Sequence, residues 1–403
     1  MPLLVRRTRV LALLIPFLLL ACSAAGQAPV TAAPAAASPA AAAPAAAPAG
    51  TWYFAVSGDS RDCGDLIMPK IAQSLDNLQA STPASFYWHL GDFRRGYGPD
   101  CDMVKRDHAD WNCQTRPENL LPVDQMSTYL FSAWDDFIKE QIDPFGQRPV
   151  YLAFGNHETA AGRTRDEMRR KFQKWLTSGP IHLQRLAESS HHFYTDEGDS
   201  YFHFIQNGVD FITLDNSAPD SFSAQQLDWL QTVLLADEAD PKVTTIVAGM
   251  HAALPYSKQR GHAMDASCQG QCSGAQAYAL LFRSQTRGKK VYVFASHAHL
   301  FVSDLFDQQP EHQGQVLPGW VVGTAGAQQY LQPADPIQYG YALVAVHPDG
   351  TLDVDFREVK RTDPPVKTGT GETELAEFCY TQNRRPPSSD ENTKSCSCGQ
   401  ALP

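Results

Sequence analysis

The tetrapeptide Gly155-Asn156-His157-Glu158 comes directly after an apolar run at residues 150–154 and presents an amide, an imidazole and a carboxylate in succession. Other short apolar runs are each followed within a few residues by a carboxylate or an imidazole, at Asp59, Asp92, His251 and His297. Ligands of open α/β sheets bind beyond the carboxyl ends of the strands. We therefore expect these points to lie together along one edge of a sheet.

Short apolar runs alternate with amphipathic stretches of helical length between residues 51 and 358. This alternation is typical of an α/β body, and the closely spaced runs near 200–214 and 340–357 indicate antiparallel hairpins. The predicted strands are residues 52–56, 86–90, 150–154, 201–205, 209–214, 244–248, 291–295, 320–322, 341–346 and 352–356. The predicted helices are residues 65–79, 124–142, 165–177, 223–235 and 274–285.

Taken singly, each polar residue at these strand ends has an ordinary structural explanation. Asp59 and Asn156-His157 can cap helices, Gly91-Asp92 can form a turn, and His297 and His299 can share a strand end. Taken together, carboxylate, amide and imidazole donors are the ligands that Zn, Mn and Fe sites use. The set therefore predicts a transition-metal site at the shared edge.

Five motifs stand in a fixed order along the chain. They are Asp59-Ser60-Arg61, Gly91-Asp92, Gly155-Asn156-His157-Glu158, Gly249-Met250-His251 and Ser296-His297-Ala298-His299. This order resembles that of the calcineurin-like metallophosphoesterase superfamily, which includes purple acid phosphatases and many bacterial phosphodiesterases. That superfamily runs Asp-x-His, Gly-Asp, Gly-Asn-His-Glu/Asp, a single His after a strand, and Gly-His-x-His. The similarity covers residues 51–358.

The resemblance implies a four-layer α/β/β/α sandwich with mixed sheets and the hydrolysis of a phosphate mono- or diester by a metal-activated hydroxide. It implies two divalent or trivalent transition-metal ions, either Mn, Fe or Zn. Asp92 would bridge the two ions, Asp59 and His299 would bind the first, and the second would be bound by Asn156, His251 and His297.

The resemblance also assigns roles beyond metal binding. Asp92 and His157 are the expected catalytic residues, and His157 would be the general acid that protonates the leaving oxygen. Glu158 would not bind the metal itself but would orient His157 or a metal-bound group by contacting it.

The chain departs from the superfamily pattern at Arg61, which stands where a histidine follows the first aspartate by two residues. A guanidinium is always charged and has no lone pair for a metal. Purple acid phosphatases also lack that histidine and use a tyrosine three residues after the bridging aspartate, where this chain has Arg95. Three outcomes are open: a weaker first metal, a substitute ligand such as water, or a single-metal site.

The same arginines are candidates for substrate binding. A guanidinium can grip phosphate oxygens in a bidentate manner, which gives Arg61, Arg94 and Arg95 a possible role. The alternative for each of them is a salt bridge within a loop.

Three arginines, Arg6, Arg7 and Arg9, precede an apolar run at residues 10–20 that ends at Ala21-Cys22. A transmembrane helix needs roughly 20 apolar residues, so this shorter run with a small-residue exit indicates a signal peptide. Residues 19–22, Leu-Leu-Ala-Cys, resemble a bacterial lipobox, whose cysteine is lipidated. Ordinary cleavage at residues 24–26 is the alternative.

The resulting domain organisation has four parts. Residues 1–22 form a lipoprotein signal peptide with Cys22 as the lipidated residue, and residues 23–50 form an Ala/Pro-rich tether too poor in apolar surface to fold. Residues 51–360 form the phosphoesterase domain, and residues 361–403 form a Cys/Pro-rich extension. By resemblance to enterobacterial lipoproteins, Ser23 favours anchoring to the outer membrane, with the domain in the periplasm or at the cell surface.

The formal net charge is −11, and it becomes −14 when the three arginines of the first 21 residues are removed. An acidic body without a Lys/Arg cluster argues against a nucleic-acid partner. It permits a small phosphorylated substrate, because bound metal cations reverse the local field. The membrane is therefore expected as a partner through the lipid anchor alone.

Apart from Cys22 the chain has eight cysteines, at positions 63, 101, 113, 268, 272, 379, 396 and 398. An even number is typical of a disulfide framework in an oxidising compartment. Structural zinc is the alternative, but the spacings at 268–272 and 396–398 differ from the two Cys-x-x-Cys-type pairs that such sites usually have. We leave the pairing open.

Three interpretations remain in competition, and the third of them is an extracellular structural domain whose histidines coincide by chance. The first is a metal-dependent phosphoesterase. The second is a catalytically impaired lipoprotein that keeps the fold and binds phosphate or metal. In that case Arg61, in place of the metal-binding histidine, is what impairs catalysis.

Overall fold

The structure is a computed structural model, and it describes residues 49–78, 82–113, 122–177, 179–188, 200–217, 220–259, 262–307, 310–312, 314–364, 370–387, 396 and 398. The chain divides into two units, residues 1–46 and 47–403, and the first unit lies outside the described residues. The signal peptide, Cys22 and nearly all of the tether also lie outside them and stay predictions. The boundary at residue 360 stays a prediction as well.

Two mixed β-sheets form the centre of the described part. The first sheet runs, in spatial order, β12 (Leu352–Val359), β11 (Tyr339–Val346), β1 (Trp52–Ser57), β2 (Ala84–His89) and β3 (Val150–Leu152). The second runs β4 (Phe202–Gln206), β5 (Val209–Thr213), β6 (Thr245–Gly249), β7 (Lys290–Ala295), β9 (Gly319–Val322) and β8 (Phe301–Val302). Strands β1, β2 and β3 are parallel to one another, and so are β5, β6, β7 and β9.

The two sheets pack face to face through aromatic side chains. Phe54 of β1 lies 5.1 Å from Phe211 of β5, and Phe86 of β2 lies 5.0 Å from the same ring, measured between ring centroids. All three side chains are buried. Alternate residues of a strand point to the same face, so β1 sends Phe54 and Val56 inward together.

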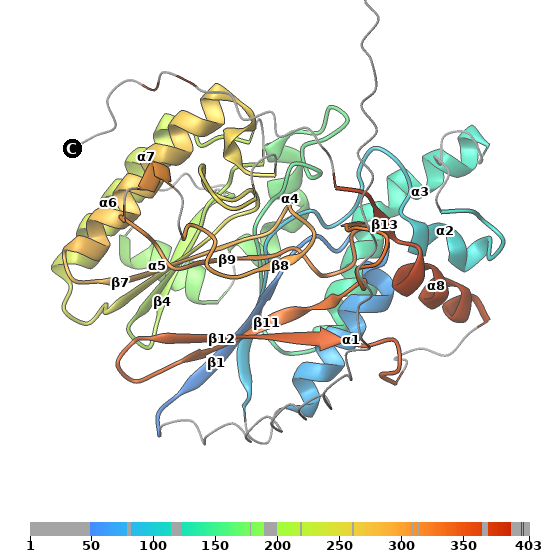
Figure 1. Cartoon of the computed structure of the whole chain (residues 1–403), viewed down its shortest axis with the longest axis horizontal. Coiled ribbons are helices and arrows are strands. Elements are labelled where there is room, and N and C mark those ends of the chain that lie inside the picture. The colour runs from blue at the N-terminus through green and yellow to red at the C-terminus, as the bar shows by residue number, and fades with distance from the viewer. Residues whose placement is uncertain are drawn as a thin grey trace, which may run out of the picture. The chain divides into compact units, whose positions relative to one another are not determined.

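Helices cover the outer faces of both sheets (Figure 1). Helices α6 (Ala224–Ala239) and α7 (Cys268–Thr286) lie against the six-stranded sheet, while α4 (Arg165–Leu176) and α5 (Pro180–Glu188) contact β3 and β4. The other side holds α1 (Gly64–Asn77), α2 (Cys101–Asp107), α3 (Val123–Asp136) and α8 (Thr370–Thr381). The fold is thus the expected four-layer α/β/β/α sandwich. None of the described helices has the length and apolar character needed to cross a membrane.

Each predicted strand is present, and the differences concern helices and short strands. The helix predicted for 124–142 is α3 followed by a π-helical turn, Phe137–Ile142. Helix α7 begins earlier than predicted, because the Ser267 side chain caps it by accepting from the N–H of Gly270 at 3.0 Å. Helices α2, α5 and α8, strand β8 and the small sheet of β10 (Gln329–Tyr330) with β13 (Arg384–Arg385) were not predicted.

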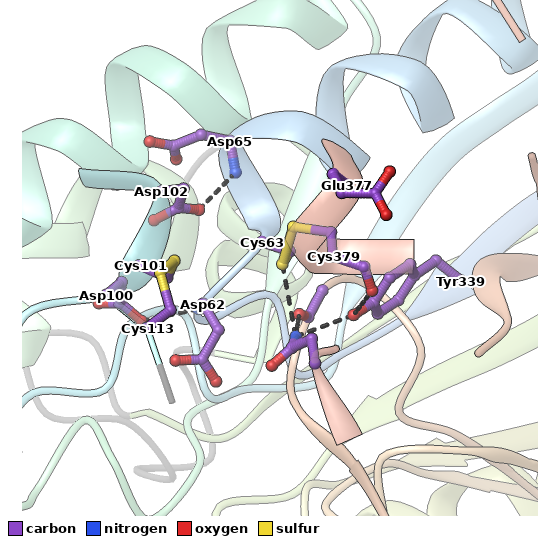
Figure 2. Close-up of a disulfide and its surroundings, with 12 residues drawn as sticks. Asp62, Cys63, Asp65, Asp100, Cys101, Asp102, Cys113, Tyr339, Glu377 and Cys379 are labelled. Carbon is purple, nitrogen blue, oxygen red and sulfur yellow. Dashed lines mark hydrogen bonds between the residues drawn. A yellow bond between two sulfur atoms is a disulfide. The ribbon is translucent and has the colours of Figure 1, made fainter. Parts of the chain in front are cut away.

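All eight cysteines other than Cys22 form disulfides, as expected, and none of these eight is left for zinc. The pairs are Cys63–Cys379, Cys101–Cys113, Cys268–Cys396 and Cys272–Cys398. Three of these pairs attach the C-terminal extension to the domain. Figure 2 shows the Cys63–Cys379 bond with Tyr339 beside Cys379 and Asp62 on the turn before Cys63. The extension is therefore fastened next to the turn that carries Arg61.

Candidate metal centre

The polar residues that follow β1, β2, β3, β6 and β7 meet at one edge of the two sheets, as the sequence predicts. Nε2 of His251 lies 3.3 Å from Oδ1 of Asp92, 3.1 Å from Oδ1 of Asn156 and 3.0 Å from Nδ1 of His297. Oδ1 of Asp59 lies 3.4 Å from Nε2 of His299. Parallel strands bring their carboxyl ends to a common edge, which explains the convergence.

Four of these residues have left-handed backbone conformations that are uncommon for residues other than glycine. Their φ angles are 61° for Asp59, 60° for Asp92, 68° for His297 and 51° for His299. Such conformations cost free energy and cluster at functional sites, where the surrounding structure imposes them. The backbone conformation at these strand ends therefore sets the direction of these four side chains at the shared sheet edge.

The first group of candidate ligands comprises Asp92, Asn156, His251 and His297. Nδ1 of His251 lies 2.8 Å from the carbonyl oxygen of Leu90, and because a carbonyl only accepts, Nδ1 carries the hydrogen. In a neutral ring, Nε2 then presents a lone pair toward the carboxylate of Asp92 and the amide oxygen of Asn156. Several electron-pair donors therefore converge on one small space.

The carboxylate of Asp92 also changes the pKa of His251. Burial opposes a charge on the ring, but the Asp92 carboxylate outweighs it and raises the pKa of His251 to about 10. A metal ion bound at Nε2 would take the position of a proton on that nitrogen.

Ser296, which stands where the superfamily has glycine, contributes to the same arrangement. Its hydroxyl donates to the carbonyl of Leu90 at 2.7 Å and lies 3.0 Å from Nδ1 of His251. The Nδ1–H of His251 can therefore be shared between the carbonyl oxygen of Leu90 and the hydroxyl oxygen of Ser296. Ser296 thus holds the His251 ring with Nε2 directed into the site.

The second group comprises Asp59, Asp92 and His299, whose candidate ligand atoms lie within 4.8 Å of one another. Nδ1 of His299 lies 2.6 Å from the carbonyl of Gln328, so Nδ1 carries the hydrogen and Nε2 carries the lone pair. Oδ2 of Asp59 accepts from the backbone N–H of His297 at 2.6 Å. Among the described residues, Oδ1 of Asp59 and Oδ2 of Asp92 are buried without a hydrogen-bond donor.

Arg61 enters the second group. Its Nη2 lies 2.7 Å from Nε2 of His299, its Nη1 contacts Nε2 of His157, and its Nε lies 3.9 Å from Oδ2 of Asp92. The side chain of Arg61 is only 11% exposed. The guanidinium therefore lies among the residues that the superfamily pattern assigns to the first metal ion.

His157 lies beside Asp92 and is oriented by backbone contacts. Its N–H donates to Oδ1 of Asp92 at 3.0 Å, and its Nδ1 lies 2.6 Å from the carbonyl oxygen of Arg95. Nε2 lies 3.6 Å from Oδ2 of Asp92 and faces the site. Burial and then the charge of Arg61 lower the pKa of His157 to about 4.

Glu158 does not orient His157, contrary to one of the two roles predicted for it. Its carboxylate accepts the backbone N–H groups of Asp92 and Phe93, each at 2.9 Å, and of Gly155 at 2.6 Å. Glu158 is fully buried. It fixes the loop that carries Asp92, while the carbonyl of Arg95 holds the His157 ring.

The prediction that Arg94 binds substrate is wrong. Arg94 is fully buried, and both of its terminal nitrogens form ion pairs, with Asp65, Asp102 and Asp136. Its neighbour Arg95 pairs with Asp62 at 2.5 Å and remains 21% exposed. Arg94 is therefore part of a buried salt-bridge network, whereas a role for Arg95 in substrate binding stays a prediction. Arg61 is the arginine that contacts the candidate ligands.

Three residues at the rim of the site were not predicted. Tyr330 of β10 stacks on His299 with ring centroids 4.8 Å apart and on His262 at 4.4 Å. The guanidinium of Arg385, from β13 in the C-terminal extension, lies 4.1 Å from the Tyr330 ring centroid. No motif marks these residues, and Arg385 comes to the rim through the pairing of β13 with β10.

A family model for calcineurin-like phosphoesterases matches residues 63–301, which is more than half of the chain. The chain therefore belongs to the calcineurin-like phosphoesterase family, as the order of its motifs predicts. The matched range begins after Asp59 and Arg61 and ends just beyond His299.

Several solved structures align with the chain at low sequence identity. A purple acid phosphatase from yellow lupin (Lupinus luteus) seeds has 14% identity and a TM-score of 0.47 over 77% of this chain and 52% of that chain. A phosphatase from Mycoplasma pneumoniae has 11% identity and a TM-score of 0.35 over 77% and 94%. A 5'-nucleotidase from Candida albicans has 12% identity and a TM-score of 0.35 over 82% and 55%.

This chain thus spans about half the length of the lupin phosphatase. No curated protein matches the chain.

Proposed function

We propose that the chain is a metal-dependent hydrolase of phosphate mono- or diesters, with its active site at Asp92, Asn156, His157, His251 and His297. The main support is the set of electron-pair donors around Nε2 of His251, together with membership of the phosphoesterase family. The donor types suit Mn, Fe or Zn. The residues of this group therefore fit a transition-metal ion.

A metal ion bound there would activate water and neutralise charge on the phosphoryl group. The chain itself supplies the positions of the reacting groups. Asp92 and His251 are fully buried, so their donor atoms are fixed before substrate arrives. Glu158 holds the Asp92 loop, and Ser296 holds the His251 ring. Such preorganisation avoids rearrangement during the reaction.

His157 is the proposed general acid. Its Nδ1–H stays with the carbonyl of Arg95, so Nε2 is the nitrogen that would protonate a leaving oxygen. Nη1 of Arg61 contacts that Nε2, so this role requires the Arg61 N–H to turn from His157 to the phosphate when substrate binds. In the absence of substrate, burial and Arg61 disfavour the protonated ring. The negative charge of a bound phosphate would offset Arg61 and favour the proton that the leaving oxygen needs.

The proposed substrate is a small phosphorylated molecule, which the bound cations would attract despite the acidic surface. We also propose that the protein is exported and lipid-anchored through Cys22. The four disulfides support an oxidising compartment. A Cys22→Ala variant should lose the lipid, as measured by the mass of the N-terminal peptide.

The activity is tested by stripping the purified protein with a chelator and adding back Mn, Fe or Zn. We expect hydrolysis of p-nitrophenyl phosphate or bis(p-nitrophenyl) phosphate only after metal is restored. His251→Ala should reduce turnover by more than about 100-fold. His347→Ala is the matched control, since His347 pairs with Asp353 at the β11–β12 hairpin, and it should retain turnover.

Two results would count against the proposal. A protein that binds no transition metal and shows no turnover is not a metallophosphoesterase. A protein that binds metal and phosphate, but whose background hydrolysis is the same in Asn156→Ala and His157→Ala, is the impaired binding lipoprotein instead.

A further inference from the structure

Nε2 of His299 has one lone pair, and Arg61 already uses it. The hydrogen of the His299 ring is on Nδ1, because Nδ1 lies 2.6 Å from the carbonyl oxygen of Gln328. Nη2 of Arg61 lies 2.7 Å from Nε2 and can only donate to it. A metal ion would have to approach Nε2 along the same direction at about 2.1 Å. The Arg61 hydrogen bond and a metal bond at His299 therefore exclude each other.

The group around His251 differs in this respect. The atoms within 3.3 Å of its Nε2 are a carboxylate oxygen of Asp92, the amide oxygen of Asn156 and Nδ1 of His297. All of them can offer a lone pair to a cation. The chain thus leaves one metal position open to a metal ion and places a guanidinium in the other.

The position of Arg61 is built into the fold. Its neighbour Asp62 forms an ion pair with Arg95 at 2.5 Å, and the next residue, Cys63, is bonded to Cys379 of α8. The disulfide therefore fastens the turn two residues from the guanidinium. With 11% of its side chain exposed, Arg61 has little freedom to leave the site.

The negative charges of Asp59 and Asp92 also favour a cationic side chain at the position of Arg61. Oδ1 of Asp59 and Oδ2 of Asp92 are buried carboxylate oxygens that lack a donor among the described residues, so they require a nearby cation. A guanidinium supplies a permanent positive charge there. Its N–H groups not used by His157 and His299 remain available for phosphate oxygens, which guanidinium binds in a bidentate manner.

We propose that the guanidinium of Arg61 takes the place of the first metal ion, so that the protein binds a single transition-metal ion at Asp92, Asn156, His251 and His297. This inference rests on the proposed function, and it specifies how the same site is occupied. Arg61 then holds the phosphate oxygen that a first ion would otherwise bind.

The test is the metal content of the full chain after chelation, reconstitution with Mn(II) and desalting, measured by inductively coupled plasma mass spectrometry. The wild-type protein should hold about one ion per chain and show the electron paramagnetic resonance spectrum of isolated Mn(II). Arg61→His restores the Asp-x-His pattern and should hold about two ions with an exchange-coupled spectrum. Arg61→Lys keeps the positive charge and should remain at about one.

A second variant keeps the test independent of the folding of Arg61→His. His299→Ala in the wild-type background should leave the metal content at about one ion, because His299 binds Arg61 rather than a metal. Two exchange-coupled ions in the wild type, or a loss of one ion in His299→Ala, would overturn the inference and leave the proposed function standing. A content of one ion in a folded Arg61→His would overturn it too. A wild type that binds no ion would instead refute the proposed function.

Discussion

Nη2 of Arg61 lies 2.7 Å from Nε2 of His299, and Nε2 of the same imidazole lies 3.4 Å from Oδ1 of Asp59. A cationic side chain is thus hydrogen-bonded to a residue that the family pattern assigns to a metal. The contact links the departure at Arg61 from the family pattern to a specific consequence for metal binding.

Glu158→Gln should weaken metal binding without removing a ligand. The carboxylate of Glu158 accepts three backbone N–H groups around Asp92, and an amide would direct its own N–H groups at some of them. We expect a loss of about 10–100-fold in metal affinity, measured by titration with Mn(II). Glu377→Gln, in the exposed pair with Arg361, is the control and should bind metal as the wild type does. Equal affinity in both variants would show that Glu158 does not support the site.

The Cys63–Cys379 disulfide should stabilise the fold more than Cys101–Cys113 does. The two bonds close segments with sequence separations of 316 and 12 residues. A longer closed loop removes more entropy from the unfolded chain, and loss of a native disulfide costs about 2–5 kcal/mol. Chemical denaturation of the two double Cys→Ala variants compares them. A larger loss for the Cys101–Cys113 variant would contradict the expectation.

Stability should fall as the pH rises from about 6.5 to about 10. His203 is buried between Asp210 and Glu188, each 2.8 Å away. Burial opposes its charge, but Asp210 and Glu188 together raise the pKa of His203 to about 10. A raised histidine pKa stabilises the fold fully below the unfolded pKa, and this contribution is lost as the pH passes through the folded pKa.

Asp237 acts in the same direction over that pH range, because burial and the charge of Asp210 raise its pKa to about 10. The free energy of unfolding in denaturant, measured at pH 7 and pH 9.5, should be smaller at the higher value. His203→Ala should cost about 3–5 kcal/mol at pH 7, since it removes the cation beside the buried carboxylate of Asp210, and should flatten this dependence. An unchanged slope in the variant would assign the pH dependence to other groups.

Arg385→Ala should raise KM for an anionic substrate and change kcat little. Arg385 lies on the Tyr330 ring, which stacks on His299, so its charge is near the mouth of the site but contacts none of the candidate metal ligands. Screening by salt should reduce the difference between variant and wild type. Arg384→Ala is the matched control, because Arg384 donates to the carbonyl groups of Pro333 and Asp335 instead. An equal effect of both changes would indicate a loss of structure rather than of charge.

The sheets and the clustered ligands were predictable because they depend on local patterns. Each strand that carries a candidate ligand is an apolar run with the polar residue just beyond it, and parallel strands bring such residues to one edge. The predicted set Asp59, Asp92, Asn156, His251 and His297 meets there for that reason.

The contacts between distant segments were not predictable in the same way. Arg94 has the same residue type and loop position as a phosphate-binding arginine, and only its burial with three aspartates excludes that role. Arg385 reaches the rim because β13 pairs with β10, a contact between very short strands with no periodic signal. The π-helical turn continues directly from α3, and no Gly or Pro marks the change between them.

The most direct test is an anomalous difference map from crystals of the Mn- or Zn-loaded protein, recorded above and below the absorption edge of the metal. The account predicts a single peak about 2.1 Å from Nε2 of His251, bound also by Asp92, with Arg61 still hydrogen-bonded to His299. A second peak between Asp59 and His299, or a peak away from His251, would contradict it.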